Sequence, residues 1–279
     1  WVGWPDAPEP YLSASGTSMV APHVAGVAAL VAQARPELGS QQLKAVLVGS
    51  AEDVGASVLD VGSGRVFAPL ALDQQVYTSP SALGFGIFPY PQTETEAMTQ
   101  TLVYTNTSET ELTLSLTADA VLQDGDPAPQ GTLTLGADSV TIPAGGSAGV
   151  AVTFDPVAAG VAAGRIGGTI VATDGGDETV RTAVMSVNEP EMYNLTIEAT
   201  SRDGSNPGFS ATAGVTPLAY QEVTSFEQFF PFFDEDGTAT VRLPVGPYGV
   251  MGIVPQVDSE TFDLFALDAV NVPEVDLVA

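Results

Sequence analysis

The sequence has no cysteine, one histidine and seven basic residues, Lys44 being the single lysine, in a chain of 279 residues. The lack of cysteine excludes disulfides, thiolate nucleophiles and zinc–thiolate centres. Aspartate and glutamate number 34, which gives a formal net charge of −27. We expect no nucleic-acid partner and no anionic membrane partner, because phosphate binding needs clustered cations. Such acidity fits solubility outside the cell, with adaptation to high salt as the alternative.

Long apolar runs are also absent. A membrane-spanning helix needs roughly 20 apolar residues, whereas the longest candidate, residues 24–34, is shorter and contains Gly26. We therefore expect a buried helix there and no transmembrane segment. The chain starts at Trp1 with neither an initiator methionine nor a signal peptide, so we expect it to be part of a longer protein.

The chain divides by pattern into three parts, and we predict a multidomain, mainly β protein. Residues 1–73 have helical periodicity, with one helix over 18–35 and a second that starts with Ser40 as its N-cap. Residues 74–188 open with a proline-rich linker or edge segment and continue as short alternating runs, which predict a β-sandwich. Residues 189–279 predict a second, smaller β-sandwich.

One stretch, Ser13 to Ala32, combines a hydroxyl, glycines, a proline and a histidine with a long apolar run. Ser18 lies where a turn meets a helix start, and there the helix dipole and free N–H groups favour a developing negative charge. Gly16 allows close backbone approach, and Thr17 is a plausible cap. The alternative is that Ser18 merely caps a buried helix.

The residues Gly16-Thr-Ser-Met, Pro22-His23-Val and Gly26 closely resemble the serine-bearing motif of the subtilisin-like serine proteases. The segments 43–55 and 62–72 also resemble the closing helix and the Gly-x-Gly-x-Val tail of that catalytic domain. The resemblance implies a truncated α/β segment whose central helix carries the nucleophile, Ser18. It also implies that the Ser18 N–H is an oxyanion donor, that Gly16, Thr17 and Met19 support it, and that Pro22, His23 and Gly26 are structural.

The sequence departs from the family in what surrounds the serine. The family orders its triad Asp, His, Ser, but no histidine precedes Ser18, and the context of Asp6 does not match the family's aspartate motif. His23 lies about 140° around the helix from Ser18, which argues against a role as general base. The first asparagine is Asn106, in the β-rich part. We therefore expect the catalytic Asp, His and oxyanion Asn upstream and no proteolysis by this fragment alone.

The β-rich parts resemble accessory modules of large secreted subtilases, Fn3- or Ig-like over 74–188 and prealbumin- or carboxypeptidase-regulatory-like over 189–279. We expect no cofactor and no catalytic metal. Structural calcium remains open at three acidic turns, which hold Asp124/Asp126, Asp174/Asp177/Glu178 and Asp234/Asp236. A cluster of phenylalanines is expected to pack over a sandwich core, a binding patch being the alternative; it consists of Phe226, Phe229, Phe230, Phe232 and Phe233.

The combined prediction is a secreted subtilisin-like serine endopeptidase that forms an acyl-enzyme on Ser18 and acts on protein or peptide substrates. The alternative, from another class, is a surface-binding or adhesion protein with a degenerate protease-like segment and contacts to a cell surface or matrix through its β-modules. Coding sequence upstream of Trp1 distinguishes the two. Asp-Thr/Ser-Gly and His-Gly-Thr-His segments there support the enzyme, and their absence supports the binding protein.

Overall fold

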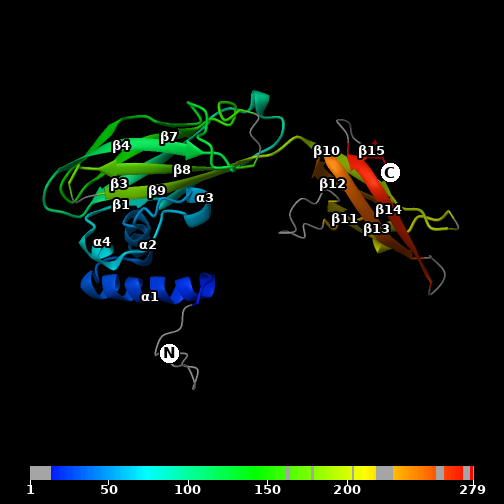
Figure 1. The fold of residues 1–279 in the computed structure, drawn as a ribbon, viewed down its shortest axis with the longest axis horizontal. Coiled ribbons are helices and arrows are strands. Elements are labelled where there is room, and N and C mark those ends of the chain that lie inside the picture. Colours follow the sequence, from blue (N-terminus) through cyan, green and yellow to red (C-terminus); the bar gives the residue numbers. More distant parts are fainter. Residues whose placement is uncertain are drawn as a thin grey trace, which may run out of the picture. The chain divides into compact units, whose positions relative to one another are not determined.

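The computed structural model describes residues 14–160, 164–176, 179–202, 204–217, 229–255, 261–272 and 277–278. Two compact units divide the chain, one that ends at Asn188 and one that begins at Glu189 (Figure 1). The architecture is mainly β, with the helices confined to the start of the first unit, as the sequence predicts.

Four helices open the described chain: α1 (Thr17–Ala34), α2 (Ser40–Gly49), α3 (Val58–Val61) and α4 (Ala68–Asp73). A small core joins three of them through Val31 of α1, Val46 of α2 and Ala71 of α4. In Figure 1, α2 and α4 lie between α1 and the strands, so α1 is the outermost helix of this unit.

The prediction that the first helix is buried is wrong for the described chain. Val31 is the one buried residue of α1, and Met19, Val20 and Leu30 are large apolar side chains exposed on it. The length and composition of α1 would allow it to cross a membrane, but core helices of soluble proteins also meet these two criteria. A helix that is apolar nearly all round is normally covered by other elements on every side. In the described chain α1 packs against the core of the helices through Val27 and Val31, both in its C-terminal half.

The predicted N-cap of the second helix is off by one residue. The cap is Gly39, whose N–H donates to Gln42 Oε1 at 2.7 Å, while its carbonyl accepts from the N–H of Leu43 at 2.8 Å. Gln42 thus makes one of the two hydrogen bonds of a capping box. The other bond, from the cap side chain to the N–H of Gln42, is missing because glycine has no side chain. The apolar residues of this helix follow i, i+3, i+4 spacing and share one face: Val46 is buried, and Leu43 and Leu47 are half-buried against the same core.

The first unit continues as a β-sandwich of two sheets. One sheet has the order β1-β3-β7-β5 and the other β2-β9-β8-β4-β6. A short 3₁₀ turn, η1 (Gln92–Glu94), follows the second strand. The strands are β1 (Val76–Ser79), β2 (Ala82–Phe88), β3 (Met98–Asn106), β4 (Leu112–Val121), β5 (Leu133–Leu135), β6 (Ser139–Ile142), β7 (Ser147–Phe154), β8 (Gly164–Thr173) and β9 (Thr179–Asn188).

The predicted alternation sets the sandwich core. Leu114 and Leu116 of β4 point inward, and so do Val150, Val152 and Phe154 of β7. The rings of two β2 residues, Phe85 and Phe88, each stack on Phe154 at a centroid distance of 5.5 Å. The segment after residue 74 is therefore no linker. It supplies β1 and β2, each at an edge of its sheet, which matches the alternative expectation of an opening edge segment.

The helices pack directly on this sandwich, and glycines allow the close approach. A Cβ on Gly167 of β8 would lie 2.5 Å from Val58 Cγ1 and 2.9 Å from Leu59 Cδ2, both of α3. A Cβ on Gly49, the last residue of α2, would lie 3.1 Å from Val180 Cγ1 of β9. A side chain at Gly167 would force α3 or the sheet to shift, whereas one at Gly49 would be tight against Val180 and require a smaller adjustment.

The second unit is a smaller sandwich, as predicted. Its sheets have the orders β12-β10-β15 and β11-β13-β14, and its core includes Leu195, Val215, Leu243 and Val250. A 3₁₀ turn, η2 (Gly208–Ser210), precedes β11. The strands are β10 (Met192–Glu198), β11 (Thr212–Pro217), β12 (Thr238–Pro244), β13 (Gly246–Pro255), β14 (Phe262–Val272) and β15 (Leu277–Val278).

The phenylalanine cluster follows its expected packing only in part. Phe233 is buried and Phe229 packs against the core, but Phe230 is 65% exposed and Phe232 is 94% exposed. The segment pairs with β11 through bridges at Phe229 and Phe232, so alternate side chains face the core and the solvent. Phe226 lies outside the described residues.

Replacement of Gly167 tests the helix-to-sheet packing. We expect Gly167→Ala to lower the stability of the first unit by about 1–3 kcal/mol, because a buried Cβ there must displace Val58 and Leu59. Calorimetry should show a melting temperature several degrees lower. Gly84→Ala is the matched strand control: a Cβ there meets nothing within 4 Å, so we expect no loss of stability. Equal melting temperatures for the two variants would contradict this packing.

Candidate functional site

The start of α1 is built on Gly16, which has φ +134° and caps the helix with its backbone. Its carbonyl accepts from the N–H groups of Met19 at 3.0 Å and Val20 at 3.2 Å. A side chain is rarely compatible with this φ, which explains the glycine. Thr17 is the first helical residue, so the expectation that Thr17 caps the helix is wrong, and no side chain caps it.

Ser18 lies in the first turn of α1, and its side chain is exposed. The N-cap is Gly16, so the alternative that Ser18 merely caps the helix is wrong as well. Among the described residues no hydrogen bond involves its hydroxyl. Its backbone N–H is one of those in the first helical turn, and these N–H groups have no acceptor within the helix. The site therefore presents a hydroxyl and a free N–H group side by side at the positive end of a helix.

The histidine is held by its own helix. Its Nδ1 lies 2.5 Å from the carbonyl oxygen of Met19, one turn earlier. A carbonyl can only accept, so Nδ1 carries a proton, and in the neutral form of the ring Nε2 is then the acceptor. His23 faces a groove of about 780 Å³ that Ser18 does not line within the described chain. The structure thus brings no base to Ser18, and the catalytic role of Ser18 stays a prediction.

This groove runs between α1 and the end of α2 and is mostly apolar. Met19, Val20 and Val24 line it from α1, and Leu47 and Ala51 from the α2 side. Its far wall is the segment 63–66. The groove is therefore an apolar surface directly beside the helix start that carries Ser18.

Two other motif residues, Pro22 and Gly26, lie inside the described helix. Pro22 is the sixth residue of α1, beyond the first turn, so its missing N–H leaves the carbonyl of Ser18 without its usual partner. A Cβ on Gly26 would meet nothing within 4 Å, so no neighbour in the described chain requires a glycine there.

The Gly-x-Gly-x-Val tail has a clear structural reason. Gly62 and Gly64 both have positive φ, and a Cβ on Gly64 would lie 2.2 Å from the carbonyl oxygen of Glu52. This contact allows Arg65 and Glu52 to exchange two backbone hydrogen bonds, at 2.8 and 2.9 Å. The tail is thereby tied to the residues that follow α2 and completes the groove wall.

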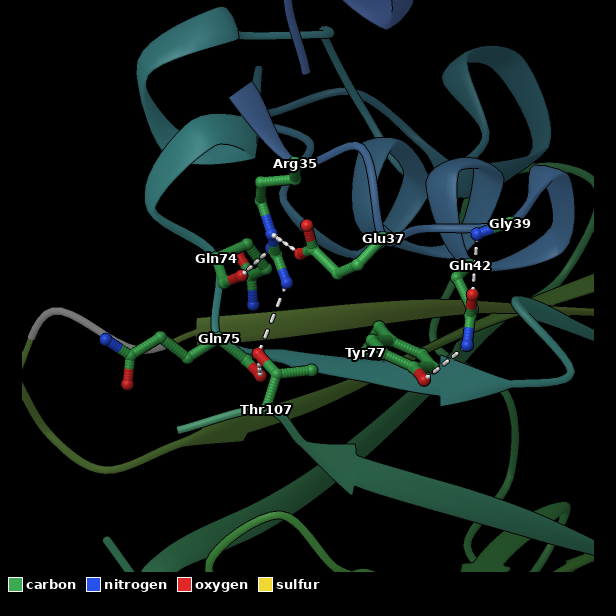
Figure 2. Close-up of polar contacts among 8 residues, drawn as sticks. All are labelled: Arg35, Glu37, Gly39, Gln42, Gln74, Gln75, Tyr77 and Thr107. Atoms are coloured by element: carbon green, nitrogen blue, oxygen red, sulfur yellow. Dashed lines mark hydrogen bonds and ion pairs between the residues drawn. The ribbon is translucent and has the colours of Figure 1, made fainter. Parts of the chain in front are cut away.

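Sequence reasoning missed the group at the other end of α1. Arg35 follows the helix directly and donates to the carbonyl of Gln74 at 2.5 Å, to Thr107 Oγ1 at 3.2 Å and to Glu37 Oε1 at 3.3 Å (Figure 2). Nearby, Gln42 donates to the hydroxyl of Tyr77 of β1 at 3.2 Å. The one feature of the sequence that could have drawn attention to Arg35 is the scarcity of basic residues, seven against 34 acidic ones.

The acidic turns proposed for calcium carry ordinary turn chemistry. Asp124 Oδ1 accepts the N–H of Asp126 at 3.1 Å, and Asp174 Oδ1 accepts that of Gly176 at 2.7 Å. Asp234 Oδ1 accepts two N–H groups in the same way, at 3.0 and 2.9 Å. No group of three or more potential metal ligands occurs in the described part of the chain. Asp177 and Glu178, like Asp6, lie outside it, and calcium at these turns stays a prediction.

Known proteins resemble the helical start of the chain, and one of them resembles most of it. The model of the subtilase family matches residues 6–82. The minor extracellular protease Vpr of Bacillus subtilis is 27% identical over 273 residues, covering 88% of this chain and 32% of Vpr. The halolysin-like extracellular serine protease Nep of Natrialba magadii is 45% identical over 71 residues, 25% of this chain and 12% of Nep. This chain thus spans about a third of the length of Vpr and less of Nep.

The geometry of His23 gives a direct prediction for this chain. His23 is the only histidine, so nitrogen NMR of its imidazole reports one residue without assignment. Near neutral pH we expect the neutral ring to carry its proton on Nδ1, because Met19 accepts it there. Ser18→Ala should leave the signals unchanged. A ring that carries its proton on Nε2, as in the chain unfolded by denaturant, would contradict the contact.

Proposed function

We propose, from the premise that residues 6–82 of this chain belong to the subtilase family, that Ser18 is the nucleophile of a secreted serine endopeptidase. The observation that carries the proposal is the placement of Ser18: an exposed hydroxyl in the first turn of an apolar helix that no side chain caps, within the segment that matches the family. The relatives are extracellular proteases by name, which supports secretion and a protein or peptide substrate.

The chemistry follows from the groups present and from those that must be supplied. A base removes the proton of Ser18 Oγ, the oxygen attacks the scissile carbonyl, and the resulting oxyanion is stabilised by the N–H of Ser18. The amine leaves with a proton from the protonated base, and an acyl-enzyme remains on Ser18. Water, deprotonated by the same base, then releases the carboxylic acid and restores the serine.

The base, its orienting aspartate and the second oxyanion donor come from polypeptide outside these 279 residues. The chain has one histidine, and its imidazole is bonded to the Met19 carbonyl and faces the groove. A serine without a base has little nucleophilic reactivity. We therefore propose that the chain on its own does not hydrolyse peptide bonds.

The exposed apolar surface of α1 fits the same proposal. Met19 is 42% exposed and Val20 is 57% exposed, and they border the apolar groove. Covering such side chains stabilises a protein by about 25 cal/mol per Å² of apolar area removed from water. The remainder of a catalytic domain, which brings the base to Ser18, would also cover this surface.

Substitution of Ser18 tests the nucleophile in a protein that joins this chain to the rest of its catalytic domain. We expect Ser18→Ala to abolish labelling by a fluorophosphonate reagent and to lower peptide hydrolysis at least 1000-fold, because the attacking oxygen is gone. Ser15→Ala, a neighbouring exposed serine, is the control and should keep its labelling. Labelling that persists in Ser18→Ala would show that the nucleophile lies elsewhere.

The isolated 279-residue chain gives a second test. We expect no turnover of casein, since no base reaches Ser18 within the described chain. Hydrolysis by this chain that disappears in Ser18→Ala would mean that it contains its own base and would overturn the proposed division of the site.

A surface-binding role for the second unit is the other candidate, and one observation favours it. The sheet β11-β13-β14 has an apolar depression of about 550 Å³, bordered by Phe230, Met251, Ile253 and Leu264. Leu264 is 74% exposed and Met251 is 59% exposed, while Phe232 lies on the neighbouring segment. Contiguous exposed apolar side chains of this kind mark interaction surfaces.

Polar replacements on this face test the binding role. We expect the pair Phe232→Ser and Leu264→Ser to lower the fraction of secreted protein that sediments with the producing cells, without a change in melting temperature. Phe233→Ser is the contrasting variant, because its side chain is buried and its loss should destabilise the unit. An unchanged cell-bound fraction would leave this face without a binding role.

A further inference from the structure

The helix that carries Ser18 is held at one end. Val31, its buried core residue, lies in the last turn, Val27 packs against the same core one turn earlier, and Arg35 follows the helix directly. At the other end, Ser18, Met19 and Val20 are exposed. Between Ser18 and Arg35 the helix rises about 1.5 Å per residue, so some 25 Å separate the nucleophile from the attachment point.

Arg35 makes the polar part of that attachment. Its side chain is 14% exposed, and all three guanidinium nitrogens are used: Nε on Glu37 and the two terminal nitrogens on the Gln74 carbonyl and Thr107 Oγ1. Thr107 follows β3, so this bond joins the nucleophile helix to the first sandwich (Figure 2).

The acceptors of Arg35 are themselves fixed. The N–H and the hydroxyl of Thr107 both donate to the Gln75 carbonyl, each at 2.9 Å. Gln74 is buried, and its Nε2 donates to the carbonyls of Val76 at 2.9 Å and Thr179 at 3.3 Å. Two of the three acceptors of Arg35, the Gln74 carbonyl and Thr107 Oγ1, thus belong to residues that are themselves hydrogen-bonded to the backbone of the sandwich or of the segment that leads into it.

We propose that Arg35 is a positioning residue of the protease: it clamps the C-terminal end of α1 to the first sandwich and thereby sets where Ser18 lies. The inference rests on the proposed function. A tilt of roughly 5° about the anchored end moves a point 25 Å away by about 2 Å, and displacements near 1 Å at a reacting atom cost about 100-fold in rate. The sandwich is thus part of the catalytic framework.

Lysine cannot replace this arginine fully. A guanidinium offers donors in a fixed planar fork that reaches several acceptors at once, whereas an ammonium is a compact point charge on a flexible stem. Arg35→Lys keeps the charge and loses the simultaneous contacts to Gln74 and Thr107. Thr107→Val removes one acceptor of Arg35, together with the hydroxyl's own bond to the Gln75 carbonyl, and leaves the sequence of α1 unchanged.

The test uses the complete protease with Arg35→Gln, Arg35→Lys and Thr107→Val, and with Arg242→Gln as a matched control. Arg242 pairs with Glu189 in the second unit. The readouts are kcat per active site, titrated with a fluorophosphonate, KM on a peptide substrate, and the melting temperature. We expect kcat per titrated site to fall about tenfold or more in Arg35→Gln with KM nearly constant, less in Arg35→Lys and Thr107→Val, and not in Arg242→Gln.

A merely structural role predicts a different pattern. It lowers the number of titratable sites or the melting temperature but leaves kcat per site unchanged, and that result would overturn the clamp. If Ser18 in the unsubstituted protease does not react with the reagent, the proposed function itself fails. Should Arg35→Gln not fold, the comparison of Arg35→Lys with Thr107→Val decides by the same criterion.

Discussion

The attachment of α1 through its C-terminal end is the constraint on which the rest of the first unit depends. Val31, Val46 and Ala71 form the small core of the helices, and α2 and α3 rest in turn on the sheet through the close contacts at Gly49 and Gly167. The position of Ser18 is therefore determined through a chain of packed elements that ends in the sandwich. An 18-residue helix with one buried residue owes its position to these contacts rather than to its own propensity.

Several of the few basic residues of this acidic protein connect segments that are far apart in the sequence. Five of the seven basic residues form ion pairs in the described chain, and Arg181 of β9 reaches Asp53 of the segment after α2. The N–H of Gly55 and then Arg181 hold the pKa of Asp53 below its ordinary value of 3.8. Because the folded pKa is depressed, this contribution is present above the ordinary value and is lost as the pH falls through the folded pKa. Its carboxylate is exposed, so solvent screens the pair.

Much of the fold could be predicted from the sequence because alternation and turn residues report local structure directly. The buried faces of β4 and β7 follow from the alternation of apolar residues, and the apolar face of α2 follows from their i, i+3, i+4 spacing. The exposure of α1 could not be predicted, because an apolar sequence predicts burial and does not report whether the chain contains the residues that would cover the helix. Arg35, Gly49 and Gly167 escaped prediction for the same reason: their partners lie far away in sequence, and no local pattern reports such contacts.

The boundary between the protease-like part and the sandwich is a shared element. The family match extends to residue 82 and so includes β1. That strand pairs with β3 from Val76 to Ser79, inside the sheet of the sandwich, and Val76 is fully buried in its core. A strand that belongs to the protease-like segment by sequence and to the sandwich by pairing cannot move independently of either. The sandwich therefore cannot be a module on a flexible tether, and a displacement of its edge strand is transmitted to the helices that carry Ser18.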